Sequence, residues 1–321
     1  MLNGFFKSRL KTIGLIILVL CYGYISYKLI QFKDWQAFKS LITKSPLYFI
    51  QILGLQLCLA LLNILIESKK WQVLLNSITK VKPGTSFKMV LAGFSTGIFT
   101  PAKIGEPFGR LMKVPRHLWG KGAVLNYFGG IIHNAVIFLT GICCTVILWI
   151  ETEYHPYQKV LLYVISVAVF IALVSISVWH FRIHIKAILK HFNIHDRINH
   201  FLSVLKLISI PKGLWIFTLS ALRFCIYSLQ LFLFFVAFGS VNTESSFLLM
   251  IPVYYMAITL IPSFLLADIG IRSSVALLLF ASTSISEPVI LLSVFMTWLV
   301  NQVFPAVGGS LLLYKRTISA E

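Results

Sequence analysis

The strongest constraint on this chain is a series of apolar stretches that are long enough to cross a membrane. A transmembrane helix needs about 20 consecutive, mainly apolar residues, because the hydrocarbon core of a bilayer is about 30 Å thick. Six stretches meet this requirement, and they cover approximately residues 12–30, 46–66, 123–150, 159–181, 213–239 and 288–314. The sequence therefore predicts an all-α polytopic membrane protein with about six full transmembrane helices.

The composition leaves no room for a separate soluble domain. Of the 321 residues, 58% are hydrophobic and only 12% are charged, whereas a soluble domain has about 25% charged residues. The segments between the apolar stretches have the length of loops. We therefore expect a single integral membrane domain over residues 1–321.

The basic residues predict the orientation of the chain in the membrane. The net charge of +18 could indicate a nucleic-acid partner, but the Lys and Arg residues lie in short segments between apolar stretches. Such residues determine topology and contact anionic lipid head groups. If both termini, 67–88, 101–121 and 180–212 are cytoplasmic, that side has 21 of the 28 Lys and Arg residues. We therefore expect cytoplasmic termini, a cytoplasmic basic loop at 180–212, and lipids rather than nucleic acid as partners.

Three apolar stretches are too short to span a bilayer. Residues 87–100 would form a helix of only about 21 Å at 1.5 Å per residue, and 247–261 and 271–285 are similarly short. With the orientation above, the segment 87–121 begins and ends on the cytoplasmic side, and the segment 247–285, which contains the other two stretches, begins and ends on the outer side. This pattern predicts two re-entrant helical hairpins that enter the membrane from opposite faces.

The two predicted hairpins resemble each other in sequence. The first reads TGIFTPAKIGEPFGR and the second TLIPSFLLADIGIR, so that each has a proline followed by charged residues around an Ile-Gly pair. We expect the helices to break at Pro101, Gly105, Pro262 and Gly270. The hairpins would belong to an inverted repeat, with the first unit at about 46–150 and the second at about 213–314. Inverted repeats place broken helices at the midplane, where transporter sites lie; the alternative is that these residues only kink two ordinary helices.

Ionisable residues at membrane depth are the candidate substrate-binding residues, because they are expensive to insert and persist when paired or when lining a wet cavity. They are Lys103, Glu106, Arg110, Arg223, Asp268 and Arg272. Two interpretations remain open. The charges could form structural salt bridges that lock the hairpin tips, or they could form a cationic cavity for a phosphate-bearing head group, which Arg can bind through two hydrogen bonds.

Several other polar or small residues have weaker signals. Glu67, Lys69, Lys70 and Trp71 directly follow an apolar stretch, and we expect them to be interfacial anchors, with a binding role as the alternative. His133 and Asn134 lie in a long span, where polar side chains usually bond a neighbouring helix, with a cavity-lining role as the alternative. Gly93 and Gly97 have the spacing of a close helix-packing face.

No catalytic, cofactor or metal motif is evident. The sequence has no P-loop, no Gly-x-Ser-x-Gly, no Gly-x-Gly-x-x-Gly and no HExxH. Its five cysteines lie in apolar stretches without metal-ligand spacing, and the His residues of 180–212 fit a basic, lipid-facing helix better than a metal site. We therefore expect no cofactor, no metal and no catalytic residue.

Three segments resemble the transmembrane region of lysylphosphatidylglycerol synthases, a family of flippase-like membrane proteins. They are ESKKWQVLL (67–75), STGIFTPAKIGEPFGRL (95–111) and IPSFLLADIGIRSSVALLLF (261–280). By position, Glu106 and Arg110 match the first family motif, and Gly270 and Arg272 match the second. Near the second break this chain lacks the Pro-Gly-Gly-x-Gly common in the family, and it has no room for the aminoacyltransferase domain.

The resemblance implies a protein of the bacterial cytoplasmic (inner) membrane that binds and flips an anionic lipid or a lipid-linked head group. Two other functions remain open. One is an intramembrane transferase acting on a phospholipid or polyprenyl-phosphate, with Glu106 or Asp268 as the base. The other is a non-transporting subunit of an envelope-polymer synthase. The partner could also be a second copy of the chain or an envelope-biosynthesis protein.

Overall fold

The computed structural model describes residues 39, 46–98, 100, 103–151, 203–239, 245–261, 265–280, 283 and 285–318. Four helices in this part of the chain are long and apolar enough to cross a membrane: Leu47–Leu75, Arg116–Ile150, Ile210–Phe238 and Glu287–Leu312. No strand occurs among the described residues. The predicted all-α membrane fold is confirmed, while the predicted spans 12–30 and 159–181 lie outside the described residues.

The helices follow one another in two similar series. The first consists of α3 (Pro46–Leu75), α4 (Pro83–Ile98), α5 (Glu106–Leu111) and α6 (Trp119–Glu151). The second consists of α9 (Ile210–Phe238), α10 (Ser245–Leu260), α11 (Leu265–Leu279), α12 (Glu287–Trp298) and α13 (Phe304–Ile318). Single turns of 3-10 helix occupy Arg116–Leu118 and Ser203–Leu207, and the π-helical segment Leu299–Val303 joins α12 to α13. Prolines in the first turns of α3, α4, α9 and α12 fit these starts, because a first-turn residue has no helical N–H bond to lose.

Two boundaries differ from the prediction, and charged residues explain both. Helix α3 continues nine residues past position 66, because Glu67 and Lys70 are buried and paired inside the protein instead of facing the interface. Helix α11 begins six residues before position 271, because Asp268 and Arg272 form an i,i+4 ion pair on one continuous helix. Gly270 therefore lies inside α11 and does not break it.

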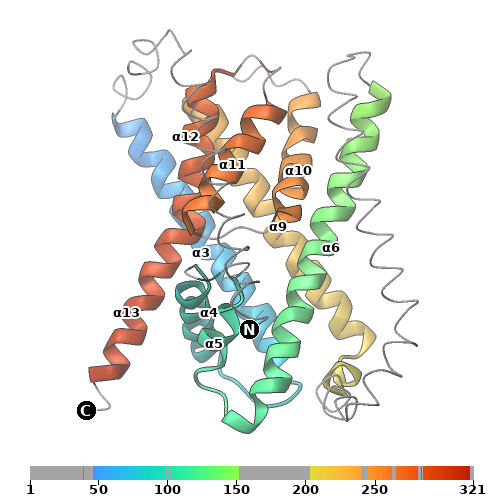
Figure 1. Ribbon diagram of the computed structural model, residues 1–321, viewed down its shortest axis with the longest axis vertical. Helices are drawn as coiled ribbons and strands as arrows, with labels where there is room; N and C mark the ends of the chain where they lie inside the picture. Colours follow the sequence, from blue (N-terminus) through green and yellow to red (C-terminus); the bar gives the residue numbers. More distant parts are fainter. Residues whose placement is uncertain are drawn as a thin grey trace, which may run out of the picture.

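Each series packs against the other. Helix α3 packs against α9, α4 packs against α13, and α10 packs against α6. Glycines allow two of these close approaches: Gly309 of α13 lies against the Leu91 carbonyl group, and Gly141 of α6 lies against Met256. Figure 1 shows the α4–α5 pair in the lower half of the molecule and the α10–α11 pair in the upper half. The two short helix pairs thus lie toward opposite ends of the long helices.

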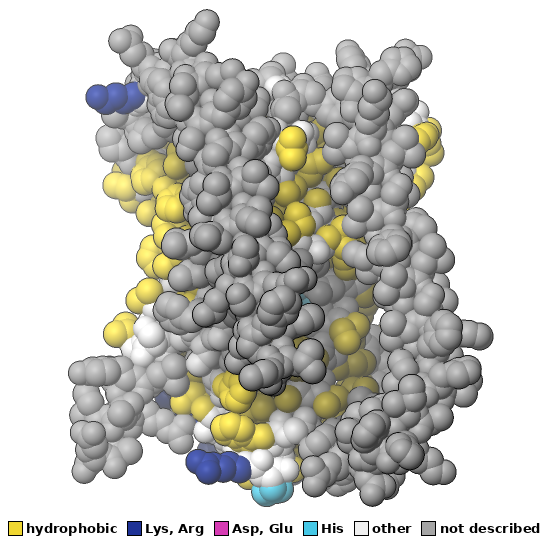
Figure 2. Space-filling model, viewed as in Figure 1, with side chains coloured by type: hydrophobic (Ala, Val, Ile, Leu, Met, Phe, Trp, Pro, Cys, Tyr) yellow, Lys and Arg dark blue, Asp and Glu magenta, His cyan; other side chains and the backbone are white. Residues whose placement is uncertain are grey.

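An aromatic core holds the second short helix pair in place. Phe235 of α9, Phe247 of α10 and Phe280 at the end of α11 are buried, with ring centroids 5.0 to 5.5 Å apart. Aromatic pairs at this separation contribute packing energy beyond their buried area. On the outside, Figure 2 shows hydrophobic side chains over much of the height of the visible face, with Lys or Arg side chains at its upper left and toward its lower end.

Candidate functional site

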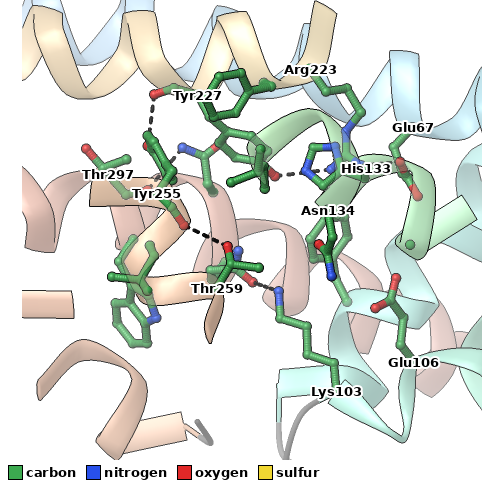
Figure 3. A pocket seen from close by; sticks show the side chains of 18 of the residues that line it. Glu67, Lys103, Glu106, His133, Asn134, Arg223, Tyr227, Tyr255, Thr259 and Thr297 are labelled. Atoms are coloured by element: carbon green, nitrogen blue, oxygen red, sulfur yellow. Dashed lines mark hydrogen bonds and ion pairs between the residues drawn. The ribbon is translucent and has the colours of Figure 1, made fainter. Parts of the chain in front are cut away.

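A cavity of about 410 Å³ lies between the two short helix pairs and is lined by residues from both series. Figure 3 shows side chains from several helices pointing into it. Among the described residues, its charged lining consists of five cationic side chains and two carboxylates: Lys70, Lys103, Arg110, Arg223, Arg272, Glu67 and Glu106. The lining is therefore net cationic.

Glu67 is the centre of the charge network. Its Oε1 accepts a hydrogen bond of 2.6 Å from Arg110 Nη1, and its Oε2 lies 2.8 Å from Lys70 Nζ and forms an ion pair with Arg223 Nη1. The Glu67 side chain is only 3% exposed. One carboxylate on α3 thus links α5 and α9, and it compensates charges that would be costly to bury alone.

Further contacts hold Arg110 in place. Arg110 also pairs with Glu106, and its guanidinium lies 5.6 Å from the centroid of the buried Trp71 ring, which adds a cation–π interaction. The approach depends on Gly93, where an added Cβ would lie 2.6 Å from Arg110 Cγ. The predicted glycine packing face on α4 is thus a contact surface for α5.

Arg223 is held from α3 and from its own helix. Its Nε donates a 2.8 Å hydrogen bond to Asn63 Oδ1, and its Nη2 donates a 3.2 Å hydrogen bond to the Tyr227 hydroxyl group. Together with the pair to Glu67, these bonds occupy each of its nitrogens. The orientation of this guanidinium is therefore set by the protein.

Lys103 reaches the cavity from the turn between α4 and α5. The turn has left-handed backbone at Lys103, with φ 57°, and the Gly105 N–H donates a 2.8 Å hydrogen bond to Thr100 Oγ1. Lys103 Nζ donates a 3.0 Å hydrogen bond to Gln302 Oε1 of the π-helical segment (Figure 3). It forms no salt bridge with a carboxylate of the described residues. π-helical turns are frequent at functional sites, and this one brings Asn301 and Gln302 into the lining.

Asp268 and Arg272 form a second ion pair on the other side of the cavity. Asp268 Oδ2 accepts 2.9 Å hydrogen bonds from Arg272 Nε and from Trp298 Nε1, which anchors α11 to α12. Arg272 lines the cavity next to an aromatic wall that includes Tyr254 and Tyr255. Asp268 therefore orients Arg272 from outside the lining.

The structure brings most of the predicted site residues together. The five that line the one cavity are Lys103, Glu106, Arg110, Arg223 and Arg272. Gly105 caps the start of α5 after the turn, as a residue at a helix break does. Pro101 and Pro262 lie outside the described residues.

Sequence reasoning missed the central carboxylate. Glu67, Lys70 and Trp71 were expected at the interface, but their exposed fractions are only 3%, 2% and 0%. The available signal was that an acidic residue directly after an apolar stretch stands three residues before a lysine, on the same helix face. His133 and Asn134 line the cavity, which fits the alternative that the sequence left open for them.

This arrangement is suited to binding an anionic group. Arginine and lysine side chains converge on a partly enclosed space, where electrostatic attraction is stronger than in bulk water. In the described part of the chain, no group of three or more His, Cys, Asp or Glu residues could hold a metal ion. The lining itself provides positive charge and hydrogen-bond donors to such a group.

Comparisons with known proteins assign the chain to a family. No curated protein and no solved structure matches the chain. The sequence model of one family, described as the lysylphosphatidylglycerol synthase TM region, matches residues 12–311. Because the match covers nearly the whole length, the chain belongs to the lysylphosphatidylglycerol synthase transmembrane-region family.

Proposed function

We propose that this protein binds an anionic lipid, or a lipid-linked anionic head group, and translocates it across the membrane. The observation that carries the proposal is the cavity of about 410 Å³, which among the described residues is lined by five cationic side chains and two carboxylates, with Asp268 paired to one of the cations, Arg272, from outside the lining. Both carboxylates, Glu67 and Glu106, are already paired with Arg110. The excess cationic charge is therefore available to a phosphate group, which arginine binds with good geometry.

The helix contacts support a transport mechanism. In the two predicted repeats, α3 corresponds to α9, α4 to α10, and α6 to α13. The contact between α3 and α9 therefore joins two corresponding helices, and the contact of α4 with α13 corresponds to that of α10 with α6. This symmetry of contacts supports an inverted repeat, with the cavity between its two short helix pairs (Figure 1). Proteins with inverted repeats alternate access by rocking one repeat against the other around a fixed site. We expect the membrane to be the bacterial cytoplasmic membrane, with both termini inside.

The transferase alternative has less support. A catalytic base needs a carboxylate that is not committed to a cation. Glu106 pairs with Arg110, and Asp268 accepts hydrogen bonds from Arg272 and Trp298. The alternative of a non-transporting envelope subunit is distinguished by the experiment below.

The test is reconstitution of the purified protein in liposomes that carry fluorescent lipids of matched acyl chains. We expect faster crossing of an anionic phospholipid than of phosphatidylcholine, without chemical change of either lipid. Head-group modification would support a transferase instead, and the absence of both activities would support a non-transporting subunit.

Substitutions at Arg272 connect the activity to the cavity. Arg272→Lys retains the charge but lacks the planar fork, so it should weaken anionic-lipid binding, and Arg272→Gln should weaken it further. Lys69→Gln removes an exposed charge from α3 and is the matched control. An unchanged lipid preference in a stably folded Arg272→Gln protein would contradict the proposed site.

A further inference from the structure

The long membrane helix Glu287–Leu312 is divided between the two series by its packing. Its first part, α12, packs against α9 and α11, whereas its second part, α13, packs against α4, which itself packs against α3 and α5. Trp298, the last residue of α12, donates a 2.9 Å hydrogen bond to Asp268 of α11. Ser95 of α4 donates a hydrogen bond to the Ala306 carbonyl oxygen of α13. The two parts of one span are therefore anchored to opposite short helix pairs.

The π-helical segment Leu299–Val303 lies between these two anchors. The Phe304 N–H donates to the Leu299 carbonyl oxygen, five residues back instead of the four of an α-helix. Pro305 follows directly and has no N–H, so a carbonyl group one turn earlier lacks its helical donor. Helices bend at π-bulges and at prolines. This segment is therefore where the span can change direction while both anchors stay in place.

One contact ties the π-helical segment to the first short helix pair. Lys103 Nζ, in the turn between α4 and α5, donates its 3.0 Å hydrogen bond to Gln302 Oε1, and both residues line the cavity. The acceptor is a neutral amide, whereas a phosphate oxygen is charged and forms a stronger hydrogen bond with lysine. An anion in the cavity therefore competes with Gln302 for Lys103.

We propose that the π-helical segment is a hinge, at which α13 moves together with α3–α5 relative to α9–α12, and that an anion in the cavity releases this hinge by taking Lys103 from Gln302. The inference rests on the proposed function and adds the moving parts and their coupling to binding. A ligand shifts a conformational equilibrium only through a difference in its interactions with the two states. Exchange of the Gln302 amide for the anion at Lys103 supplies that difference.

Distances between spin labels on the intact protein test the motion. In a background without native cysteines, labels at Ser310→Cys of α13 and Leu278→Cys of α11 measure the distance across the hinge. Labels at Ser310→Cys and Lys113→Cys, after α5, are on the same side of the hinge and are the control. All three positions are exposed. In nanodiscs of phosphatidylglycerol, compared with phosphatidylcholine, we expect the first distance distribution to shift and the second to stay the same.

A one-residue deletion tests the π-helical segment itself. Because a π turn holds more residues than an α turn, deletion of Val303 should join α12 and α13 in one continuous α-helix. Val303 does not line the cavity, so binding of phosphatidylglycerol should be retained, while the distance shift and lipid crossing are lost. Val303→Ala keeps the length of the segment and is the matched control, in which both should persist. Melting curves identify a deletion that fails to fold, in which case the wild-type distances decide.

Substitutions of Gln302 test the release. Gln302→Met removes the acceptor of Lys103, so the shifted distance should become more populated even in phosphatidylcholine. We expect an increase of about two- to tenfold, as for the loss of one hydrogen bond of modest net energy. Gln302→Glu offers Lys103 a carboxylate, which forms a stronger hydrogen bond. It should reduce the distance shift at equal phosphatidylglycerol occupancy, measured by native mass spectrometry.

Each outcome has a distinct meaning. If the wild type binds phosphatidylglycerol but neither distance shifts, or both do, the hinge is overturned and the proposed function stands. Lipid crossing at the wild-type rate in a folded Val303 deletion would also overturn the hinge. Wild-type distances in Gln302→Met would overturn the release through Lys103. If phosphatidylglycerol binds no better than phosphatidylcholine, the proposed function itself fails, and release by an anion fails with it.

Discussion

Gln56 of α3 and Gln230 of α9 form a reciprocal pair of hydrogen bonds. Gln56 Nε2 donates to the Gln230 carbonyl oxygen at 3.0 Å, and Gln230 Nε2 donates to the Gln56 carbonyl oxygen at 3.1 Å. Both side chains are fully buried. The contact is therefore symmetric between the first helices of the two series, and it joins the two series to each other.

The first prediction concerns this pair. In a double-mutant cycle with Gln56→Leu and Gln230→Leu, we expect a coupling of about 0.6 kcal/mol and at most about 1.7 kcal/mol, the range for hydrogen bonds between membrane helices. Reversible unfolding in mixed micelles would measure it. Strict additivity of the two substitutions would show that the reciprocal bonds contribute nothing to stability.

The second prediction concerns Glu67. Removal of one partner from a buried ion pair typically costs about 3–5 kcal/mol, because the other charge loses its compensation. Glu67→Gln leaves Lys70, Arg110 and Arg223 with less negative charge nearby, so its melting temperature should fall steeply. Lys69→Gln on the exposed side of α3 should change it little. Similar melting temperatures for both variants would contradict the central role of Glu67.

The third prediction concerns Asp268. It accepts hydrogen bonds from Arg272 on its own helix and from Trp298 on α12. Asp268→Ala should destabilise the protein by about 1–3 kcal/mol, as expected when a partly buried charged hydrogen bond is lost. The substitution should also free Arg272 to move and change anionic-lipid binding. If neither stability nor binding changes, Asp268 does not hold Arg272.

The fourth prediction compares alanine substitutions at two helical glycines. A Cβ at Gly109 of α5 would collide with the backbone carbonyl group of Ala92, whereas a Cβ at Gly54 of α3 meets nothing within 4 Å. Ala is favoured over Gly in a helix by about 1 kcal/mol. Gly54→Ala should therefore be neutral or stabilising, and Gly109→Ala destabilising. Thermal unfolding of the two variants is the measurement, and equal effects would refute the close α4–α5 contact.

The fifth prediction concerns orientation. In a background without native cysteines, Lys80→Cys, after α3, should react with a membrane-impermeant thiol reagent from the cytoplasmic side. Ser286→Cys, before α12, should react from the outside. Both positions are exposed, so labelling of whole cells and inverted vesicles can compare them. Reaction of both from the same side would contradict the predicted topology.

Sequence alone was sufficient for the membrane class, the family and most of the charged residues of the site. Apolar stretches of this length predict transmembrane helices, because a helix satisfies its own backbone hydrogen bonds in lipid. Charge at membrane depth is rare enough that residues such as Arg110, Arg223 and Arg272 stood out against the apolar background. The number of spans beyond the described part, and the inverted repeat itself, stay predictions.

Tertiary structure alone decided which charges from distant parts of the chain meet. Glu67 is 43 residues from Arg110 and 156 from Arg223 along the chain, and no local pattern encodes a contact at such separations. The same is true of the turn at Lys103, whose side chain reaches Gln302, and of the π-helical segment that presents it. Helix periodicity specifies which face a residue occupies, but the partner of that face depends on how α3, α5 and α9 pack. The sequence therefore determined that the charges had to be buried together, and the packing of distant helices determined that Glu67 is the residue that joins them.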